Sequence, residues 1–397
     1  MSHKLETASN TGGRGIIQGL FMHKIVHLTS AHPRNDTRIF IKQCRTLAAH
    51  GYDVTLVVAD DKGEECRDGV TITDVGRLPG RLRRIFTTTR RVRDRALSLD
   101  ADLYQLHDPE LLPVGLALKR RGKTVIFDSH EDVPRQLLNK PYLGRLSGRA
   151  LSLAFALMER YACSRFDGVI AATPFIRDKF LKFKPDTVDV NNFPLVGELE
   201  SATPWANKRQ EVCYVGGIGE IRGIRELVSA ARHVQSAARI NLVGAFSEPA
   251  LEAQVRADPG WERVNELGFL DRKGVREVME RSLAGIVTFH RLPNHVDSHP
   301  TKMFEYMSAG IPVIGSDFPL WRDIIEGNGC GLCVNPADPR AIARAIDHLL
   351  AHPQLARSMG ENGRRAVLNK YNWAVQARKL TDFYGAITHV RHSVAHV

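Results

Sequence analysis

The sequence predicts an α/β protein built from two doubly wound, Rossmann-like domains that face a cleft. The chain of 397 residues is too long for one ordinary core, and its composition, 43% hydrophobic and 25% charged, is typical of packed globular domains. Short β-rich runs alternate with helix-length segments, and this alternation occurs twice, on either side of a polar stretch. Ligands of such sheets bind beyond the carboxyl ends of the strands, where the cleft is expected.

The regular pattern of the first half begins at Lys24. A helix is expected over Asp36–His50, closed by Gly51. The strands predicted here are Lys24–Thr29, Asp53–Val58, Leu103–Leu106, Thr124–Phe127 and Gly168–Ala171. Apolar runs of this length, separated by helices, are typical of a parallel sheet covered on both faces. We therefore predict a loose tail over 1–22 and a first Rossmann-like domain over 23–196.

The pattern of the second half restarts after the polar stretch Gly197–Glu211, which contains Pro204. The strands predicted here are Glu211–Val215, Ile240–Val243, Arg263–Leu267, Ala284–Phe289, Pro312–Ile314 and Gly331–Val334. They predict a second Rossmann-like domain over 211–370. A final helix, about Trp373–Ile387, follows the last element that this domain needs, so the segment 371–397 is expected to pack back on the first domain.

The formal net charge is +11, and nearly all of the basic excess lies in residues 1–195. This asymmetry favours either an anionic partner for the first half or a well-solvated basic face, and composition leaves both open. A nucleic-acid partner is not expected, because the basic stretch lacks interleaved aromatic residues apart from Phe86 and no known nucleic-acid-binding motif is present.

Cysteine usage and hydropathy indicate an intracellular protein. Four cysteines lie in apolar stretches, as buried thiols of a reducing compartment do. Cys330 and Cys333 form a C-x-x-C pair, but no second Cys or His pair completes a zinc site near them. No apolar run approaches the roughly 18–20 residues that span a bilayer. The first 22 residues are a poor signal peptide, so the expected location is the cytoplasm.

The segment Asn294–Gly310 (NHVDSHPTKMFEYMSAG) is the first that carries chemistry. The proline within it suits the first turn of a helix, and Ser298 is a candidate N-cap. The unpaired N–H groups at such a helix start form a site for a diphosphate, and Lys302 adds a cation. Asp297 precedes the helix and Glu305 lies about two turns along it, so the two acids can bind different parts of one elongated ligand. The alternative is an ordinary amphipathic helix with a solvated Glu.

The stretch Tyr214–Ile224 (YVGGIGEIRGI) is the second. A strand ends at Gly216 and Gly217, and a helix begins near Arg222. Glycines at such a turn let backbone N–H groups approach phosphate oxygens closely. The signal is weak by itself, since it lacks the G-x-G-x-x-G spacing of a dinucleotide fingerprint and the G-K-[ST] of a P-loop.

Taken together, these residues resemble the GT4 family of retaining glycosyltransferases, which have the GT-B fold. The resemblance rests on the order of Gly216–Gly217 with Arg222, Asp297-x7-Glu305, AGIPVIGSD at Ala309–Asp317, and Asp323–Ile325. Three N-terminal pieces, HPRNDTRIFIKQ, QLHDPELLP and FDSHED, are similar to one bacterial branch of the family. The resemblance spans nearly the whole chain.

The resemblance implies transfer of a sugar, with retention of anomeric configuration, from a UDP- or GDP-linked nucleotide sugar to a saccharide or lipid-linked acceptor. It points to bacterial surface polysaccharide or lipopolysaccharide assembly, with no cofactor and no metal. A literal D-x-D at Asp100–Asp102 precedes a strand, so it is expected to form a turn away from the ligand. Two other functions stay open: a nucleotide-sugar epimerase of similar build, and a non-catalytic GT-B partner protein.

By resemblance, Glu305 takes the position of the acid that holds the nucleotide ribose, and Asp297 that of the acid that binds the donor sugar. Lys302 and Arg222 would face the diphosphate. Two departures from the family pattern bear on this. At the first acidic position of the pattern the family usually has Glu, whereas this chain has Asp297, whose side chain is one methylene shorter. At position 217, where many members have an Arg, this chain has Gly217.

Four polar residues follow two strands of the first half: His107, Asp108, His130 and Glu131. Because they lie at the carboxyl ends of their strands, we expect them to face the cleft. They are candidates for binding the acceptor. His130 matches a family histidine that approaches the acceptor and the donor sugar. Its alternative is a hydrogen-bonded structural role.

A basic segment in the first half suggests a membrane contact. Only Asp94 opposes its arginines in sequence, and Leu82 and Phe86 are among the apolar residues that interrupt them. The arginines are Arg77, Arg81, Arg83, Arg84, Arg90, Arg91, Arg93 and Arg95. Helices of this kind lie on anionic leaflets, so we expect peripheral association with the inner face of the plasma membrane, with Lys140–Arg160 as a second contact. The alternative is that the apolar residues pack inward and the arginines face water.

Overall fold

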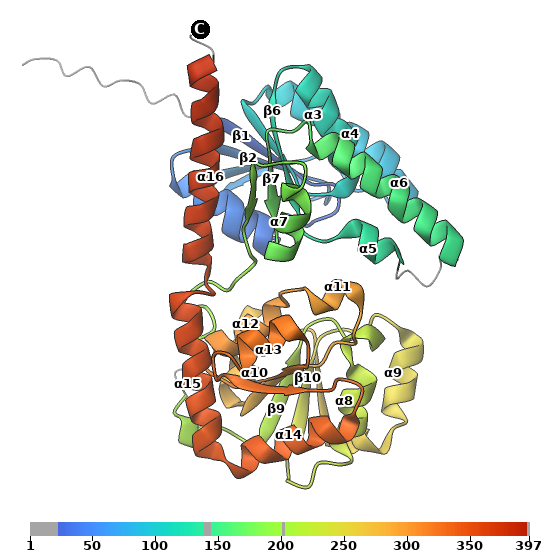
Figure 1. Ribbon diagram of the computed structural model, residues 1–397, viewed down its shortest axis with the longest axis vertical. Helices are drawn as coiled ribbons and strands as arrows, with labels where there is room; N and C mark the ends of the chain where they lie inside the picture. The colour runs from blue at the N-terminus through green and yellow to red at the C-terminus, as the bar shows by residue number, and fades with distance from the viewer. Residues whose placement is uncertain (1–22, 139–143, 201–202, 395–397) are drawn as a thin grey trace, which may run out of the picture.

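A computed structural model describes residues 23–138, 144–200 and 203–394 of the chain. It contains two α/β domains stacked end to end, each built on a largely parallel sheet (Figure 1). The predicted fold class is confirmed. The expected tail over 1–22 and Lys140 lie outside the described residues.

The described first domain holds a sheet in the order β3-β4-β2-β1-β5-β6-β7-β8, parallel except for β3 against β4. The strands are β1 (Lys24–Leu28), β2 (Asp53–Val58), β3 (Glu65–Arg67), β4 (Val70–Asp74), β5 (Leu103–Leu106), β6 (Thr124–Ser129), β7 (Gly168–Ala171) and β8 (Thr187–Asp189). The helical segments are η1 (Thr37–Cys44), α1 (Arg45–Ala49), α2 (Arg81–Arg83), η2 (Arg84–Thr88), α3 (Thr89–Leu99), η3 (Pro109–Leu111), α4 (Leu112–Arg120), α5 (Val133–Leu138), α6 (Arg145–Cys163) and α7 (Pro174–Leu181).

The second domain has a parallel sheet in the order β11-β10-β9-β12-β13-β14. The strands are β9 (Glu211–Val215), β10 (Arg239–Val243), β11 (Val264–Gly268), β12 (Ala284–Val287), β13 (Val313–Ser316) and β14 (Gly331–Val334). The helical segments are η4 (Trp205–Asn207), η5 (Glu220–Arg222), α8 (Ile224–Ala231), α9 (Pro249–Arg256), η6 (Pro259–Arg263), α10 (Arg272–Arg281), α11 (Pro293–Val296), α12 (Thr301–Ser308), α13 (Pro319–Ile325), α14 (Pro339–Ala351) and α15 (Pro353–Asn369).

Each sheet is buried on both faces, which explains why its strands are nearly continuous apolar runs. In the first domain, α3, α4, α6 and α7 cover one face, and η1, α1 and the last helix cover the other. In the second domain, α8, α9 and α14 cover one face, and α10, α12, α13 and α15 the other. Polar side chains are therefore concentrated at the strand ends.

The last helix, α16 (Trp373–Val394), leaves the second domain and runs along the first (Figure 1). Trp373, Leu380 and Tyr384 are buried in the first domain's core. The indole of Trp373 donates to the hydroxyl of Thr46 at 2.9 Å, and its backbone N–H donates to the carbonyl of Pro194 at 2.8 Å. The two segments that connect the domains are thus hydrogen-bonded to each other.

Gly168, at the start of β7, lets α16 approach the sheet closely. A Cβ on this residue would lie 2.5 Å from Cζ of Phe383 and 2.8 Å from Cδ1 of Ile387. Both distances are shorter than van der Waals contact, so a side chain at this position forces Phe383 and Ile387, or the helix that carries them, to move.

We predict that Gly168→Val lowers the free energy of unfolding by about 1–3 kcal/mol, because it overpacks the contact with α16. Urea denaturation followed by circular dichroism measures this. Gly385→Ala is the matched control: it lies on the same helix with nothing within 4 Å of an added Cβ, and it is expected to be neutral or slightly stabilising. Equal stability of the valine variant and the wild type would contradict the packing.

Candidate functional site

Lys302 lies in the first turn of α12 with its ammonium group buried between two aromatic rings. Nζ is 3.6 Å from the ring centroid of Tyr214 and 5.4 Å from that of Phe289. It finds no hydrogen-bond partner among the described residues, and the residue is only 7% exposed. Burial, and then the charge of Arg222, hold the pKa of Lys302 well below its usual range. Within the described residues, this ammonium group therefore makes no hydrogen bond to a carboxylate.

The glycine turn after β9 lies directly against this ammonium group. A Cβ on Gly216, where φ is +124°, would be 3.0 Å from Nζ of Lys302. A Cβ on Gly217 would be 3.7 Å from the guanidinium carbon of Arg222. The two glycines and the two cations that the sequence analysis singled out are therefore brought together. A side chain at position 217 would be in van der Waals contact with the guanidinium group of Arg222.

Gly223, which the sequence analysis did not single out, is required by the same turn. Its φ is +73°, and a Cβ would lie 1.9 Å from the carbonyl oxygen of Thr288. The start of α8 can therefore approach the end of β12 only with glycine here. The glycine directly after Arg222, before the expected helix, was the feature of the sequence that could have identified Gly223 as part of this turn.

Asp297 lies in the loop between α11 and α12 and reaches across to the first domain. Its carboxylate accepts a hydrogen bond from Arg135 of α5 at 3.0 Å, and the same guanidinium donates to the carbonyl of Pro293 at 3.2 Å. The pair is about one-third exposed on each side. Arg135 was missed by sequence reasoning, since nothing in a sequence connects residues so far apart in the chain.

The expectation that Ser298 caps α12 is wrong. The helix begins at Thr301, with Pro300 at the N-cap position and no side-chain cap. The hydroxyl of Ser298 instead donates back to the carbonyl of His295 at 2.8 Å, and its own carbonyl accepts from the indole of Trp321 at 2.9 Å. Ser298 lies too early in the chain to cap the helix, and it shapes the preceding loop.

Glu305 is largely buried on α12, and Arg272 at the start of α10 donates to its carboxylate at 2.7 Å. Arg272 also donates to Glu198 at 2.8 Å. The charge of Glu305 is thus already matched by a cation before any ligand binds. The sequence analysis missed Arg272, which is an unremarkable helix-start arginine until the fold brings it to α12.

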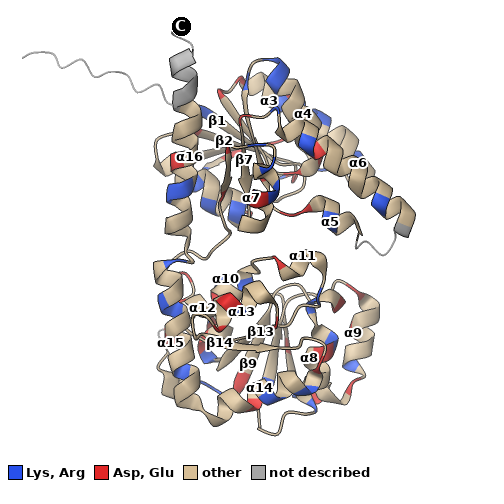
Figure 2. Cartoon of the chain, in the orientation of Figure 1, with Lys and Arg blue, Asp and Glu red and all other residues tan. Residues whose placement is uncertain are grey.

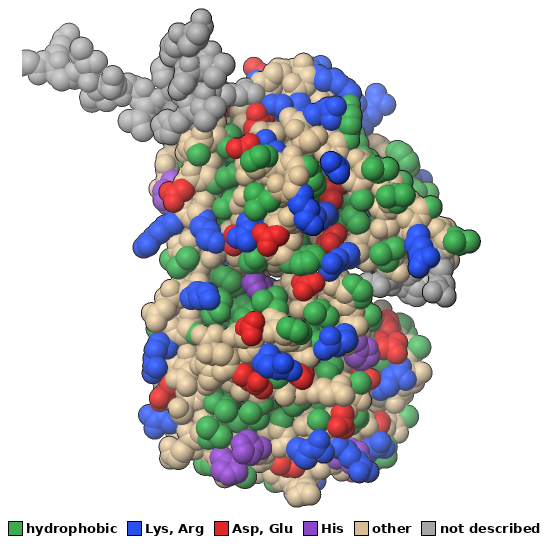
Figure 3. Space-filling view, viewed as in Figure 1, with side chains coloured by type: hydrophobic (Ala, Val, Ile, Leu, Met, Phe, Trp, Pro, Cys, Tyr) green, Lys and Arg blue, Asp and Glu red, His purple; other side chains and the backbone are tan. Residues whose placement is uncertain are grey.

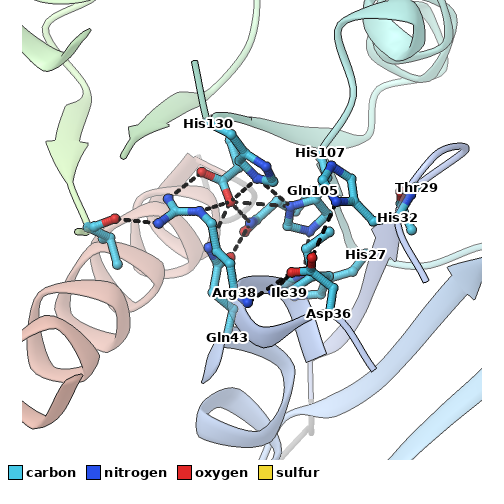
Figure 4. Close-up of polar contacts among 12 residues, drawn as sticks. His27, Thr29, His32, Asp36, Arg38, Ile39, Gln43, Gln105, His107 and His130 are labelled. Carbon is cyan, nitrogen blue, oxygen red and sulfur yellow. Dashed lines mark hydrogen bonds and ion pairs between the residues drawn. The ribbon is translucent and has the colours of Figure 1, made fainter. Parts of the chain in front are cut away.

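The first domain presents a cluster of histidines at its strand ends (Figure 4). His130 follows β6, and its Nε2 lies 3.0 Å from the carboxylate of Asp128 and 3.3 Å from Nδ1 of His107. Asp128 is fully buried and accepts hydrogen bonds from Arg38 at 2.6 and 3.1 Å. Burial acts to raise the pKa of Asp128, but the charge of Arg38 and the hydrogen bonds from the neighbouring imidazoles outweigh it and hold that pKa well below its usual range.

Two of the four residues expected on the acceptor side do not line a pocket. His107 and Asp108 are each 2% exposed. Asp108 accepts from the hydroxyl of Thr29 at 2.8 Å and from the backbone N–H of Ser30 at 2.6 Å, so it holds the loop after β1. The strand-end position was correct, but neighbouring loops cover both residues. Glu131, in contrast, is exposed and accepts from the amide of Gln136.

One group in the described chain has ligand atoms close enough for a metal ion: His107, Asp128 and His130. The guanidinium of Arg38 lies on the same carboxylate, so a positive charge already occupies the place where a cation would bind. Asp100 and Asp102 lie at the opposite, amino end of the sheet. Asp100 pairs with Lys123 at 2.6 Å, and Asp102 accepts from the backbone N–H of Lys24 at 2.9 Å.

A cavity of about 460 Å³ continues the site along the carboxyl ends of β12, β13 and β14. Its lining is rich in charged and amide side chains, and within it His290 and Glu226 lie 3.0 Å apart. The lining residues are Glu226, His290, Arg291, Asp317, Asn335, Pro336 and Ala337. Such a surface suits a ligand that carries many hydroxyl groups.

Two protein-family profiles match the chain in succession. Residues 39–195 match a family described as "Glycosyl transferase 4-like domain", and residues 197–366 match one described as "Glycosyl transferases group 1". Alpha-D-kanosaminyltransferase of Streptomyces kanamyceticus is 27% identical over 183 residues, 45% of this chain and 46% of that enzyme. Phosphatidyl-myo-inositol mannosyltransferase of Mycobacterium leprae is 25% identical over 307 residues, 75% of this chain and 76% of that enzyme. The match to the first of these spans about half of its length.

Solved structures share the fold at low sequence identity. Sucrose-phosphate synthase from Thermosynechococcus elongatus superposes with a TM-score of 0.76 at 19% identity, over 93% of this chain and 100% of that chain. Anabaena HepE in complex with UDP-glucose superposes with a TM-score of 0.69 at 14% identity, over 92% of this chain and 100% of that chain.

We predict that Lys302→Met raises the free energy of unfolding of the ligand-free protein by about 1 kcal/mol or more, because it removes an unpaired buried ammonium group. The folded-state pKa of Lys302 is depressed, so its penalty is complete below that pKa and shrinks as pH rises toward the unfolded value of about 10.4. The gain from the variant must shrink in the same direction.

Denaturation at several pH values measures this gain. Lys273→Met, on the exposed face of α10, is the control and is expected to change stability by less than about 0.5 kcal/mol. A methionine variant at position 302 that is less stable than the wild type at neutral pH would show that the ammonium group is already compensated.

Proposed function

This chain belongs to the GT4-like family of GT-B glycosyltransferases, and from that premise we propose a specific reaction for it. The protein transfers a sugar, with retention of configuration and without a metal, from a UDP- or GDP-linked donor to a saccharide or lipid-linked acceptor. The pathway is bacterial surface polysaccharide or lipopolysaccharide assembly. The observation that carries the proposal is the buried, unpaired ammonium group of Lys302 beside the glycine turn.

A buried cation without a counter-ion is costly unless a ligand supplies the charge. Lys302 lies at the start of α12 and against Gly216, with Arg222 on the other side of the turn. A nucleoside diphosphate brings two negative charges or more to this place. When the sugar–phosphate bond breaks, negative charge develops on the leaving diphosphate, and preorganised cations and N–H groups stabilise that charge most. The expulsion of the diphosphate is thus favoured without a metal.

The remaining donor contacts are the ones that the family resemblance assigns to Glu305 and Asp297. Glu305 binds the ribose hydroxyls while Arg272 holds its carboxylate in place, and Asp297 binds hydroxyls of the donor sugar. Anabaena HepE, which shares this fold, has been crystallised in complex with UDP-glucose, and this supports a donor of the same chemical class. On the opposite wall, His130 approaches the acceptor and the donor sugar. The leaving phosphate takes the proton of the acceptor hydroxyl on the same face of the sugar.

A membrane surface is the proposed location of the acceptor, and α6 is its contact. Its Leu146, Leu153, Leu157 and Tyr161 follow one face of the helix and are 82%, 63%, 61% and 51% exposed. Figure 3 shows hydrophobic side chains along this outer edge of the first domain. Such a patch on a helix indicates an interaction surface.

Basic residues border this apolar stripe, as an anionic leaflet requires. Figure 2 shows Lys and Arg residues along α3, α4 and α6. In the segment Arg77–Arg95, Leu82 and Phe86 are each 71% exposed, whereas Val92 is fully buried. Glu110 pairs with Arg84 and Glu64 with Arg95, so this segment carries less unpaired charge than its sequence suggests. Within the described residues, no helix is long and apolar enough to cross a bilayer.

We predict that UDP or GDP binds in EDTA and raises the melting temperature by mass action. Glu305→Ala weakens this binding by roughly 10- to 150-fold, because a charged hydrogen bond contributes about 1.5–3 kcal/mol. Lys302→Met also weakens it, although that variant is more stable without ligand. Calorimetric titration with UDP, GDP and CDP measures the affinities, and Lys273→Met is the surface control.

Failure of every nucleoside diphosphate to bind would refute the proposal. Binding that disappears in EDTA and returns with Mg²⁺ or Mn²⁺ would refute the metal-free mechanism alone. Product analysis with the nucleotide sugar that binds, with and without acceptor, distinguishes transfer from epimerisation.

We predict that the protein sediments with anionic vesicles and not with neutral ones, and that salt weakens this binding. Leu153→Glu with Leu157→Glu abolishes it, and Arg83→Glu or Arg90→Glu reduces it by roughly five-fold each, since one basic residue at the surface contributes about 1 kcal/mol. Arg357→Glu, an exposed reversal on α15 with the same charge change, is the control. Absence of sedimentation at low salt would contradict the proposed surface.

A further inference from the structure

The carboxylate of Asp128 is surrounded by donors that fix its position and its charge. Arg38 donates to both of its oxygens and also to the carbonyl of Val190 at 2.7 Å, and the amide of Gln43 donates to Oδ2 at 2.7 Å. All of these groups are buried in the first domain. An ionised carboxylate only accepts hydrogen bonds, so every ring nitrogen that faces Oδ2 must carry a proton.

Two ring nitrogens face this oxygen: Nε2 of His130 at 3.0 Å and Nδ1 of His107 at 3.2 Å. The contact of His130 with this oxygen is a hydrogen bond, and the two ring nitrogens also lie 3.3 Å apart. We assign a proton to each nitrogen that faces the carboxylate, because a lone pair there would oppose its negative charge. His107 then has a lone pair at Nε2, which accepts from Nδ1 of His27 at 2.9 Å. Burial lowers the pKa of both His27 and His107, which keeps each ring neutral with a single proton.

The far end of this arrangement agrees with the assignment. Nε2 of His27 is buried and has no partner among the described residues. When the proton of His27 is on Nδ1, its Nε2 is an unpaired acceptor. Proteins tolerate an unpaired buried acceptor better than an unpaired buried N–H. The reverse set of tautomers would leave such an N–H in the core.

A second chain of hydrogen bonds runs from Asp128 to the last helix. The amide nitrogen of Gln43 faces Asp128, so its oxygen accepts from Gln105, whose own oxygen accepts from the hydroxyl of Tyr384 on α16. Each amide is therefore fixed in one orientation, and the chain is fully buried.

We propose that Asp128 is the positioning residue of His130: it holds Nε2–H, and thereby presents the lone pair of Nδ1 to the cleft as an acceptor for a sugar hydroxyl. The ring of His130 is 16% exposed, and its Nδ1 has no hydrogen bond within the described chain. The ring nitrogen that bears the proton is set by the bond that the other nitrogen makes. His32, whose ring centroid is 5.2 Å away, is held by Asp36 and Asp108 and leaves this arrangement unchanged. The value of this lone pair for catalysis rests on the proposed function.

The first test reads the tautomer directly in the ligand-free protein. Long-range ¹H–¹⁵N correlation spectra of histidine-labelled protein, assigned with His130→Gln, are expected to show the neutral ring of His130 as the single Nε2–H form. In Asp128→Asn the spectrum is expected to shift to a mixture of the two neutral tautomers. A Nδ1–H form in the wild type, or identical His130 spectra in the two proteins, would overturn the proposal.

The second test measures transfer with the nucleotide sugar selected by titration. Asp128→Asn is expected to reduce kcat by 10-fold or more while UDP affinity stays within two-fold, since the nucleotide contacts lie on the other domain. Gln43→Leu and Tyr384→Phe retain the pair of Asp128 with Arg38, so they test the chain if the asparagine variant does not fold. We expect each to lower kcat two- to ten-fold, and an unchanged kcat in both would overturn the chain.

The two proposals fail separately. If His130→Ala transfers sugar as well as the wild type but the tautomer is as stated, the catalytic use of His130 is wrong and its positioning by Asp128 stands.

Discussion

Parallel strands that are buried on both faces have no room for polar side chains except beyond their ends. In this chain the carboxyl ends of both sheets are turned toward one cleft, so the polar residues of β5 and β6 face those of β9 and β12. Polar side chains that can bind a ligand are therefore restricted to the strand ends. The turns and helices that follow the strands determine how closely a ligand can approach these ends. Gly216 and Gly223 show the second effect, because each replaces a side chain that would block the turn.

The two walls of the cleft treat buried charge in opposite ways. On the first domain, Asp128 is surrounded by Arg38, Gln43 and two imidazoles, so its charge is matched before anything binds. On the second domain, the ammonium group of Lys302 is buried against two aromatic rings and the glycine turn, with no hydrogen-bond partner among the described residues. The matched site holds a side chain in a fixed orientation, whereas the unmatched site carries a free energy cost that an anionic ligand relieves. Orientation and binding are thus assigned to different domains.

Much of the fold was predictable because hydrophobic patterning is local. The strands Asp53–Val58, Glu211–Val215 and Gly331–Val334 have the predicted bounds. Strands β3, β4 and β8 were missed. Strands β3 and β8 are three residues long and lack an apolar run, and β4 (VTITD) alternates polar and apolar residues over only five positions. Within the candidate site, the glycine turn and Lys302 lie far apart in the sequence, and the family resemblance is what linked them before the structure placed them in contact.

The partners of the site residues were not predictable in the same way. Arg272, Arg135 and Arg38 are ordinary surface arginines in the sequence, and they reach Glu305, Asp297 and Asp128 only through the fold. Ser298 was misjudged because capping depends on the residue at which a helix begins, and Pro300 moved that residue to Thr301. His107 was placed correctly along the chain, but local sequence says little about which loops will cover a strand end.

The bond between Trp373 and Pro194 has a mechanical consequence. The chain passes between the domains twice, and this bond joins both passages at one point on the side where α16 lies. Two connections that are fixed at one point favour a hinge motion, in which the domains rotate about that edge. They resist shear and twisting of one domain against the other. Movement is then largest at the far edge, where Arg135 and Asp297 meet. A swing of the domains about that edge would separate Arg135 from Asp297, which are joined across the domains at 3.0 Å.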